Sequence, residues 1–203
     1  SMLQQPNTVP PRPSGQPWGT RLRRAGLWAV LCLPVWPMSV QAAQPVSALP
    51  VVHWPGLLGD WYEVARLDNP LERACAHSPR ARYQWSSRTD ALLELVNQCT
   101  LANGRIKRVV GYAPVHGHGG QLAVSPSRWL GRVLSMPYWI LQVEPAQGQG
   151  PYQQVLIGSP DRRLLWLMSR QPVLPAGVEA RLLQRAAQMG YRVDQLRRDP
   201  HLP

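Results

Sequence analysis

The sequence predicts an all-β fold: an eight-stranded antiparallel up-and-down barrel with one C-terminal α-helix packed against its outside. Three observations support this prediction. Strand-like segments recur at short, regular spacing, apolar and polar residues alternate within the clearest of them, and one amphipathic segment follows the last strand. Closure into a barrel removes the exposed edges of an open sheet, although a two-sheet sandwich would show the same periodicity. The predicted strands span residues 61–67, 79–86, 91–99, 105–113, 120–125, 137–144, 152–158 and 163–169.

Alternation is clearest in the second and third predicted strands. In the segment ALLELVNQ, one face carries Leu93, Leu95 and Asn97. In RARYQW, one face carries Tyr83 and Trp85, and arginine and glutamine occupy the other. One buried and one hydrated face is typical of antiparallel sheet. An eight-stranded barrel is wide enough for one small ligand, so we expect the apolar faces to line its interior.

The predicted helix follows the last strand. Pro175 suits a first helical position, and Gly190 suits the stop that follows a helix. Apolar residues between them form one stripe, which we expect to pack on the outside of the sheet. The stripe consists of Val178, Leu182, Leu183, Ala186 and Met189.

The first part of the chain has the features of an export signal. Residues 21–43 (RLRRAGLWAVLCLPVWPMSVQAA) pass from basic to apolar to small residues. Pro34 and Pro37 interrupt the apolar stretch, which argues against a membrane-spanning helix. We therefore expect an N-terminal extension and signal peptide over residues 1–42 and a single domain over residues 43–203.

A cysteine lies inside the apolar stretch of this signal. Lipid anchoring needs a small residue before the cysteine, and Cys32 follows the large Leu31, so an anchor there is disfavoured. We expect an exported protein that is periplasmic or associated with the outer membrane.

The chain is basic, with 22 Lys and Arg against 11 Asp and Glu among 203 residues. Nucleic-acid sites cluster basic side chains with stacking aromatics on one face. Here the arginines are spread from Arg66 to Arg198, mostly singly and at most in pairs, which indicates hydrated strand faces and no nucleic-acid partner. The same positive charges would give the protein a mild attraction to acidic lipid headgroups.

Two cysteines in the predicted domain are candidates for a disulfide. If strands 79–86 and 91–99 form a hairpin that turns near residues 87–88, the numbers of opposed residues sum to about 174–177. Cys75 and Cys99 fit that register and would lie within disulfide reach. An oxidising compartment favours the bond, and two free buried thiols are the alternative.

Two separated motifs resemble those of the lipocalin family, in the branch of the bacterial outer-membrane lipocalins and apolipoprotein D. Residues 59–66 (GDWYEVAR) are similar to the GxWYExAR opening of that branch. Residues 157–170 (IGSPDRRLLWLMSR) are similar to its GxPDRxYLWILSR signature. The resemblance implies a structural base of the barrel, with Gly59 and Trp61 in the opening motif and Arg170 stacked across the indole.

The resemblance also implies a function and a partner. A hydrophobic small molecule, such as a fatty acid or lysophospholipid, would bind inside the barrel, with a role in envelope lipid maintenance. The apolar connection 127–137 would allow contact with a membrane, and a homodimer is a further possibility. The expected lining residues are Tyr83, Trp85, Leu93, Leu95, Asn97, Tyr112, Tyr138 and Trp139.

Enzymatic and cofactor-binding alternatives have weaker support. The sequence has no GxSxG elbow and no HExxH, so we expect no catalytic residues and no enzyme activity. His116 and His118 could bind a metal, but no third ligand is evident and a surface turn is favoured. His53 and His77 could be axial ligands of a haem or tetrapyrrole, yet neither falls on a clear inward face. We expect no metal and no cofactor.

Overall fold

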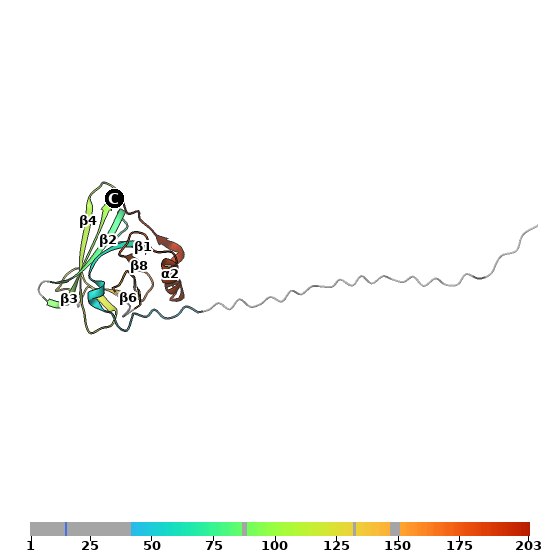
Figure 1. Ribbon diagram of the computed structural model, residues 1–203, viewed down its shortest axis with the longest axis horizontal. Coiled ribbons are helices and arrows are strands. Elements are labelled where there is room, and N and C mark those ends of the chain that lie inside the picture. The colour runs from blue at the N-terminus through green and yellow to red at the C-terminus, as the bar shows by residue number, and fades with distance from the viewer. Residues whose placement is uncertain (1–14, 16–41, 87–88, 132, 147–150) are drawn as a thin grey trace, which may run out of the picture. The chain divides into compact units, whose positions relative to one another are not determined.

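Eight consecutive antiparallel strands form the wall of a barrel in the computed structural model, which describes residues 15, 42–86, 89–131, 133–146 and 151–203 (Figure 1). The strand order is β4-β3-β2-β1-β8-β7-β6-β5, and a short strand β9 pairs with β1. This confirms the predicted fold class. The strands are β1 (Gly59–Leu67), β2 (Cys75–Ser86), β3 (Thr89–Leu101), β4 (Ile106–Pro114), β5 (Gln121–Val124), β6 (Met136–Glu144), β7 (Gln154–Gly158), β8 (Leu165–Ser169) and β9 (Leu196–Arg197).

The barrel nearly closes where the two ends of this order meet. Tyr112 on β4 and Ser125 after β5 exchange two backbone hydrogen bonds of 2.8 and 2.9 Å. A short helix α1 (Trp54–Leu57) precedes β1 at one end of the barrel, which we call the base. Because successive strands alternate in direction, the β1–β2, β3–β4, β5–β6 and β7–β8 connections all lie at the opposite end, the mouth.

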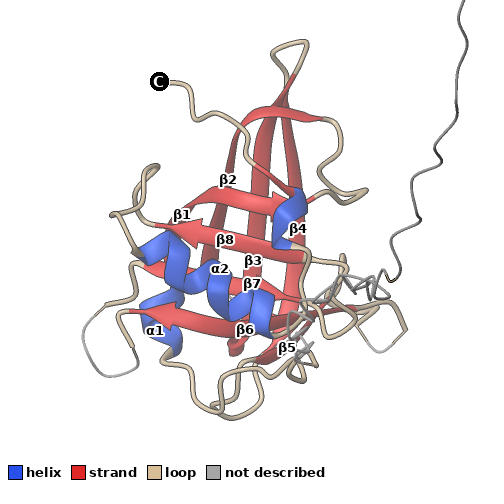
Figure 2. Ribbon diagram, turned by 90° about the vertical axis from the view of Figure 1, so that its right-hand side faces the viewer, coloured by secondary structure: helices blue, strands red, loops and turns tan. Residues whose placement is uncertain are grey.

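Two apolar cores share the strands on one side of the barrel. Along β8, Trp166 and Met168 point into the barrel, and Leu165 and Leu167 point outward. The outward residues pack under the helix α2 (Val178–Gln188), which lies across the outer face of the barrel (Figure 2). Every residue of β7 and β8 is therefore buried, and their sequences show no polar face.

The helix forms in the predicted segment, but it begins at Val178, with Gly177 as its N-cap, and not at Pro175. Gly190 follows it with φ of +82°, a conformation that glycine adopts without strain. From its stripe, Leu182, Ala186 and Met189 are fully buried against the barrel wall. The helix thus covers a second apolar layer without entering the barrel.

The predicted disulfide is confirmed, although its two cysteines do not lie directly opposite each other in the ladder. Cys75 and Cys99 are bonded, with their Cα atoms 5.6 Å apart. Tyr83 lies opposite Leu95, whereas the expected register would place it opposite a residue between 91 and 94. Bulges at the start of β2 then shift the pairing, so that Cys75 lies opposite Leu101. The bond therefore runs diagonally across the ladder.

Candidate functional site

The base of the barrel is sealed by Trp61 and Arg170. The Trp61 indole is buried, and its N–H donates to the Leu57 carbonyl at 2.7 Å. The Arg170 guanidinium lies 3.7 Å above the indole ring and donates to the carbonyls of Asp60 and Leu58, both at 2.7 Å. This arrangement orders the chain between α1 and β1 and leaves no entry at this end.

Gly59 is part of the same arrangement. Its φ of +95° lies in the left-handed region, and an added Cβ would come within 3.2 Å of Arg170 Nη1. A side chain here would both strain the backbone and crowd the guanidinium.

The lower half of the barrel is filled by side chains. Leu93, Leu95 and Tyr83 are all buried there, and Trp85 packs partly buried against them. The hydroxyl of Tyr83 is hydrogen-bonded to that of Tyr138 at 2.5 Å, and burial raises the pKa of both phenols. This tyrosine pair separates the packed lower half from the space above it.

A small cavity of about 50 Å³ lies inside the barrel above the tyrosine pair. Two of the expected lining residues, Asn97 and Tyr138, contribute to its wall. It also contains carboxyl groups that the sequence analysis did not select. The lining residues are Glu63, Leu71, Glu72, Asn97, Val109, Met136, Tyr138, Trp166 and Met168.

Two residues expected to face the interior lie outside the barrel. Tyr112 pairs across the ladder with Glu94 on the hydrated face, and its ring lies 4.8 Å from the Arg128 guanidinium carbon. Trp139 packs with the outer core near α2, because the side chains on either side of it, Tyr138 and Ile140, point inward. The prediction that Tyr112 and Trp139 line the interior is therefore wrong, because each lies on the outward face of its strand.

A bulge in β1 brings a carboxyl and a guanidinium to the same inner face. Glu63 lies opposite Met168, and Arg66 lies opposite Trp166, with a shift of register between Glu63 and Ala65. Strict alternation would place Arg66 on the outer face. The bulge reverses this, so Glu63 and Arg66 both point inward from the same strand.

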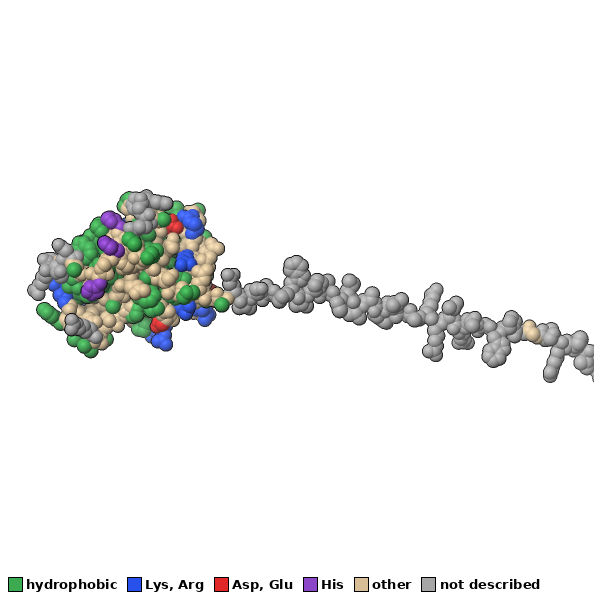
Figure 3. All heavy atoms as spheres, turned by 90° about the horizontal axis from the view of Figure 1, so that it is seen from below, with side chains coloured by type: hydrophobic (Ala, Val, Ile, Leu, Met, Phe, Trp, Pro, Cys, Tyr) green, Lys and Arg blue, Asp and Glu red, His purple; other side chains and the backbone are tan. Residues whose placement is uncertain are grey.

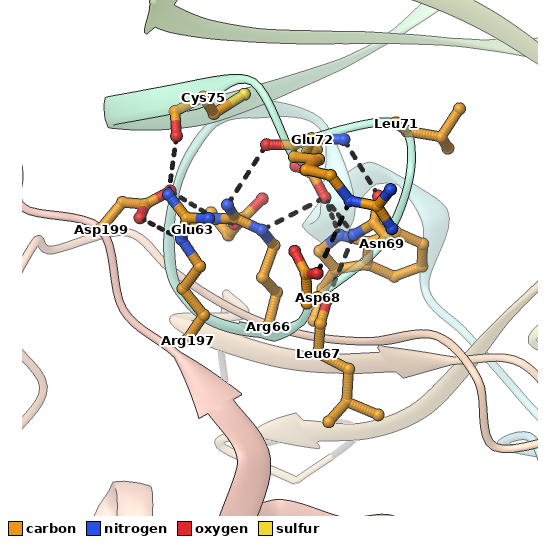
Figure 4. Close-up of polar contacts among 12 residues, drawn as sticks. Glu63, Arg66, Leu67, Asp68, Asn69, Leu71, Glu72, Cys75, Arg197 and Asp199 are labelled. Carbon is orange, nitrogen blue, oxygen red and sulfur yellow. Dashed lines mark hydrogen bonds and ion pairs between the residues drawn. The ribbon is translucent and has the colours of Figure 1, made fainter. Parts of the chain in front are cut away.

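Arg66 is fully buried at the centre of a charged network near the mouth (Figure 4). One of its terminal nitrogens, Nη1, lies 2.7 Å from Glu63 Oε1 and 2.7 Å from Asp199 Oδ2. Asp199 also accepts from Arg197 at 2.7 Å, and Arg197 donates to the Cys75 carbonyl. The network therefore ties the C-terminal segment and the start of β2 to the inner face of β1.

The connection between β1 and β2, residues 68–74, covers the cavity, and we call it the flap. Its residue Glu72 accepts hydrogen bonds at one oxygen from the Trp166 indole N–H at 2.8 Å and from Asn69 Nδ2 at 2.7 Å. On the far side, the Lys107 ammonium donates to the Leu71 carbonyl. Because the flap contacts both β8 and β4, it spans the mouth above the cavity.

The carboxyl group of Glu63 is strongly perturbed. Burial raises its pKa well above the usual value of 4.5, and the neighbouring Glu72 carboxyl raises it further. The Arg66 guanidinium acts in the opposite direction but is outweighed. Glu63 therefore retains a proton at pH values where an exposed glutamate has lost it.

The cavity residues that sequence reasoning missed differ in how they could have been found. Glu63 lies two residues after Trp61 in one strand, so alternation alone places it inside. Trp166 lies in a strand whose first four residues are all apolar, so no alternation is visible around it. Glu72 lies in a connection, where periodicity carries no information.

The histidines considered as ligands do not reach the cavity. His116 and His118 are exposed, and Figure 3 shows histidine side chains at the surface on the face drawn there. His53 is exposed before α1, and His77 lies on β2 with its ring nitrogen 3.0 Å from the Ser78 hydroxyl. Among the residues that the structure describes, no three potential metal ligands cluster. None of the described helices is long and apolar enough to span a membrane.

A barrel with a sealed base and a covered cavity at its mouth defines a small-molecule binding protein of the calyx type. A family model described as a lipocalin-like domain matches residues 54–201. The chain therefore belongs to the lipocalin family, and its curated relatives include the bacterial Blc branch. This membership supports binding of a hydrophobic ligand in the barrel.

Two relatives and two solved structures illustrate the similarity. The chain is 25% identical over 149 residues to temperature-induced lipocalin-1 of Arabidopsis thaliana, covering 70% of this chain and 76% of that protein. It is 26% identical over 144 residues to the outer membrane lipoprotein Blc of Escherichia coli K12, and the match covers 68% of this chain and 73% of that protein. The solved structures share the fold at low identity. Cockroach allergen Per a 4 has a TM-score of 0.59 at 13% identity, covering 78% of this chain and 95% of that one. Insecticyanin of the tobacco hornworm has a TM-score of 0.57 at 15% identity, and the match covers 78% of this chain and 85% of that one.

Proposed function

We propose that this protein is exported to the cell envelope, where it binds a single-chain lipid, a fatty acid or lysophospholipid, inside the barrel. The observation that carries the proposal is the cavity at the mouth, whose wall combines Val109, Met136 and Met168 with a few polar groups. Two observations support the location: the sequence pattern of residues 1–42, which predicts an export signal and lies almost entirely outside the described residues, and the similarity to outer-membrane lipoproteins.

Ligand entry requires the flap to move. Sites for small molecules usually measure about 300–1,000 Å³, well above the 50 Å³ of the covered cavity. The groups that hold the flap closed are polar contacts of Glu72 and Leu71 with the barrel wall. Burial of an acyl chain returns ~0.8 kcal/mol per methylene, so about ten methylenes offset the loss of these contacts.

A membrane is the source we propose for the lipid. The connection between β5 and β6 lies at the mouth and exposes Trp129 and Val133 at 84% and 86%, with Leu130 and Leu134 also exposed. Apolar side chains at such exposure, in a basic chain, fit the interfacial region of a bilayer that contains acidic lipids. Self-association of the protein through these side chains is the alternative that the test below distinguishes.

Native mass spectrometry of the protein purified from membrane-containing cells tests the proposed cargo. We expect a discrete added mass, which organic extraction identifies as a fatty acid or lysophospholipid. Protein that remains free of lipid, even after incubation with both lipid classes, would contradict the proposal.

Sedimentation with anionic phospholipid vesicles tests the proposed membrane contact. Val133→Ser is expected to reduce the bound fraction, and Val173→Ser, at a similarly exposed position beyond the base end of β8, is the matched control. Equal binding of both variants would contradict a role for the mouth segment. If Val133→Ser instead converts a dimer to a monomer in size-exclusion chromatography, the segment is a subunit interface.

A further inference from the structure

We propose that the barrel cavity selects amphiphiles with a cationic ammonium headgroup over those with a carboxylate headgroup, and that Glu63 and Glu72 determine this selectivity. The inference rests on the proposed function and narrows it, because a preference for ammonium over carboxylate headgroups favours lysophospholipids that carry an ammonium group over fatty acids. It follows from the charge balance of the network and from the side chains that share the cavity.

The network at the mouth has more carboxyl groups than guanidinium groups. Asp199 contacts both Arg66 and Arg197 at 2.7 Å and so takes a large share of the positive charge. Of the two guanidiniums, Glu63 pairs only with that of Arg66, and the Glu72 carboxylate lies 3.8 Å from Arg66 Nε. With all groups ionised, the three carboxylates exceed the two guanidiniums by one negative charge.

This excess charge lies where a ligand would meet it. Of the three carboxyl groups, Glu63 and Glu72 line the cavity and Asp199 does not. Glu63 is buried, so water screens its charge little. A headgroup that enters the cavity therefore meets two carboxyl groups at close range.

Aromatic rings occupy the wall beside these carboxyl groups. Tyr138 and Trp166 both line the cavity, with ring centroids 5.3 Å apart. Aromatic faces combined with carboxylates form a favourable environment for ammonium groups, through cation–π attraction and charge pairing. The same surroundings offer little to a carboxylate, because the one buried guanidinium is already shared among protein carboxyl groups.

The titration of Glu63 is consistent with this selectivity. Burial is the largest cause of its raised pKa, and the neighbouring Glu72 carboxyl raises this pKa further, so one proton held at Glu63 reduces the excess negative charge of the network. An ammonium headgroup would supply the positive charge that this proton supplies in the empty protein. Binding of an ammonium amphiphile should therefore release protons and strengthen as the pH rises through the Glu63 titration.

Three amphiphiles with the same twelve-carbon chain test the proposal by isothermal titration calorimetry near pH 8, below their micellar concentrations. Dodecanol measures binding of the chain alone, dodecyltrimethylammonium carries the cation, and dodecanoate carries the carboxylate. We expect the wild-type protein to bind the ammonium compound about tenfold or more tightly than dodecanoate.

Variants assign the selectivity to the cavity. Glu63→Gln and Glu72→Gln, each shown by circular dichroism to be folded, should both reduce the affinity ratio of ammonium to carboxylate severalfold. Glu94→Gln removes a carboxylate that pairs with Arg128 on the outer face and should leave the ratio unchanged. Dodecanol affinity should change little in any of the three.

Equal affinities for the two charged compounds in the wild type would overturn the proposal. The proposal would also be overturned if neither Glu63→Gln nor Glu72→Gln changed the affinity ratio of ammonium to carboxylate. If dodecanol and both charged compounds fail to bind, the proposed function itself is wrong, and the selectivity falls with it.

Discussion

Arg66 holds the mouth of the barrel together through charge pairs that are shielded from water. Its side chain is fully buried, and it contacts carboxyl groups from β1 and from the C-terminal segment. A buried ion network contributes little beyond an apolar replacement of the whole set, but removal of one member leaves the others uncompensated. The sensitivity of the fold to single substitutions should therefore be high here.

Replacement of Arg66 by methionine tests this sensitivity. We expect Arg66→Met to lower the free energy of unfolding by about 3–5 kcal/mol, because Glu63 and Asp199 lose their shared partner. Urea unfolding monitored by circular dichroism measures the change. The control Arg82→Met removes an exposed pair with Asp60 and should cost under about 1 kcal/mol. Equal losses in the two variants would contradict the account of the network.

The raised pKa of Glu63 predicts a pH dependence of stability. The folded state holds the proton more tightly than the unfolded state, whose pKa is near 4.5. The stabilisation that comes from this proton is fully present below pH 4.5, and it is lost as the pH rises through the raised pKa of Glu63 in the folded state. In the range from pH 4.5 up to the raised folded-state pKa, Glu63 therefore lowers the free energy of unfolding as the pH rises.

Glu63→Gln removes this titration while keeping the shape of the side chain. Urea unfolding across that pH range should show the variant gaining stability relative to the wild type as the pH rises. A difference between the two proteins that stays constant with pH would show that Glu63 titrates normally in the folded state.

Arg170 seals the base by geometry as well as by charge. Besides its stacking on Trp61, it donates to the carbonyls of Gly56, Leu58 and Asp60. Lysine retains the charge but lacks the planar array of donors, so Arg170→Lys should lose about 1–3 kcal/mol of stability. Thermal unfolding measures this, with Arg163→Lys at an exposed position as the control. A melting temperature like that of the control would mean that the carbonyl contacts contribute nothing.

At the scale of elements, the local patterns that sequence analysis uses are strong in β2 and β3 and weak elsewhere. Alternation identifies Tyr83, Leu93 and Leu95 as interior residues because the opposite faces of these strands are hydrated. It does not identify the inward faces of β4 and β6, where Tyr112 and Trp139 were expected to point inward but point outward. In the strands under α2, inward and outward positions are both apolar, because the helix buries the outer face as well. Their sequences therefore do not show which residues point into the barrel.

The charged network at the mouth was not predictable, because it depends on irregular backbone. The bulge in β1 turns Arg66 inward, and no residue in that strand signals a bulge by its type. Glu72 and Asp199 come from segments without regular structure and meet Arg66 only after the whole barrel has closed. Contacts of this kind are set by tertiary structure.

The disulfide joins the end of the flap to β3 and provides a prediction for this element. Cys75 and Cys99 are separated by 24 positions, and closure of such a loop restricts the unfolded chain by about 3 kcal/mol. Reduction, or the paired change Cys75→Ser with Cys99→Ser, should lower stability by about that amount, as measured by urea unfolding. A loss well below 1 kcal/mol would show that the bond does not constrain the unfolded state as this estimate assumes.

At the scale of the molecule, the barrel divides into regions with different tasks. The base is closed by α1, Trp61 and Arg170, and the lower half is packed to the Tyr83–Tyr138 pair. The mouth combines a cavity, a polar network and a flap attached at both sides. Both ends of the barrel are thus held by buried contacts, and the movement that ligand entry needs falls on the flap at the mouth.

The central claim is that a hydrophobic ligand occupies the cavity at the mouth, and obstruction of that cavity tests it most directly. Val109 on β4 lines the cavity, and Ile106 on the same strand faces outward. Titration calorimetry with dodecanol should show at least about tenfold weaker binding for Val109→Trp and unchanged binding for Ile106→Trp. Wild-type affinity in a folded Val109→Trp protein would place the ligand elsewhere and contradict the account.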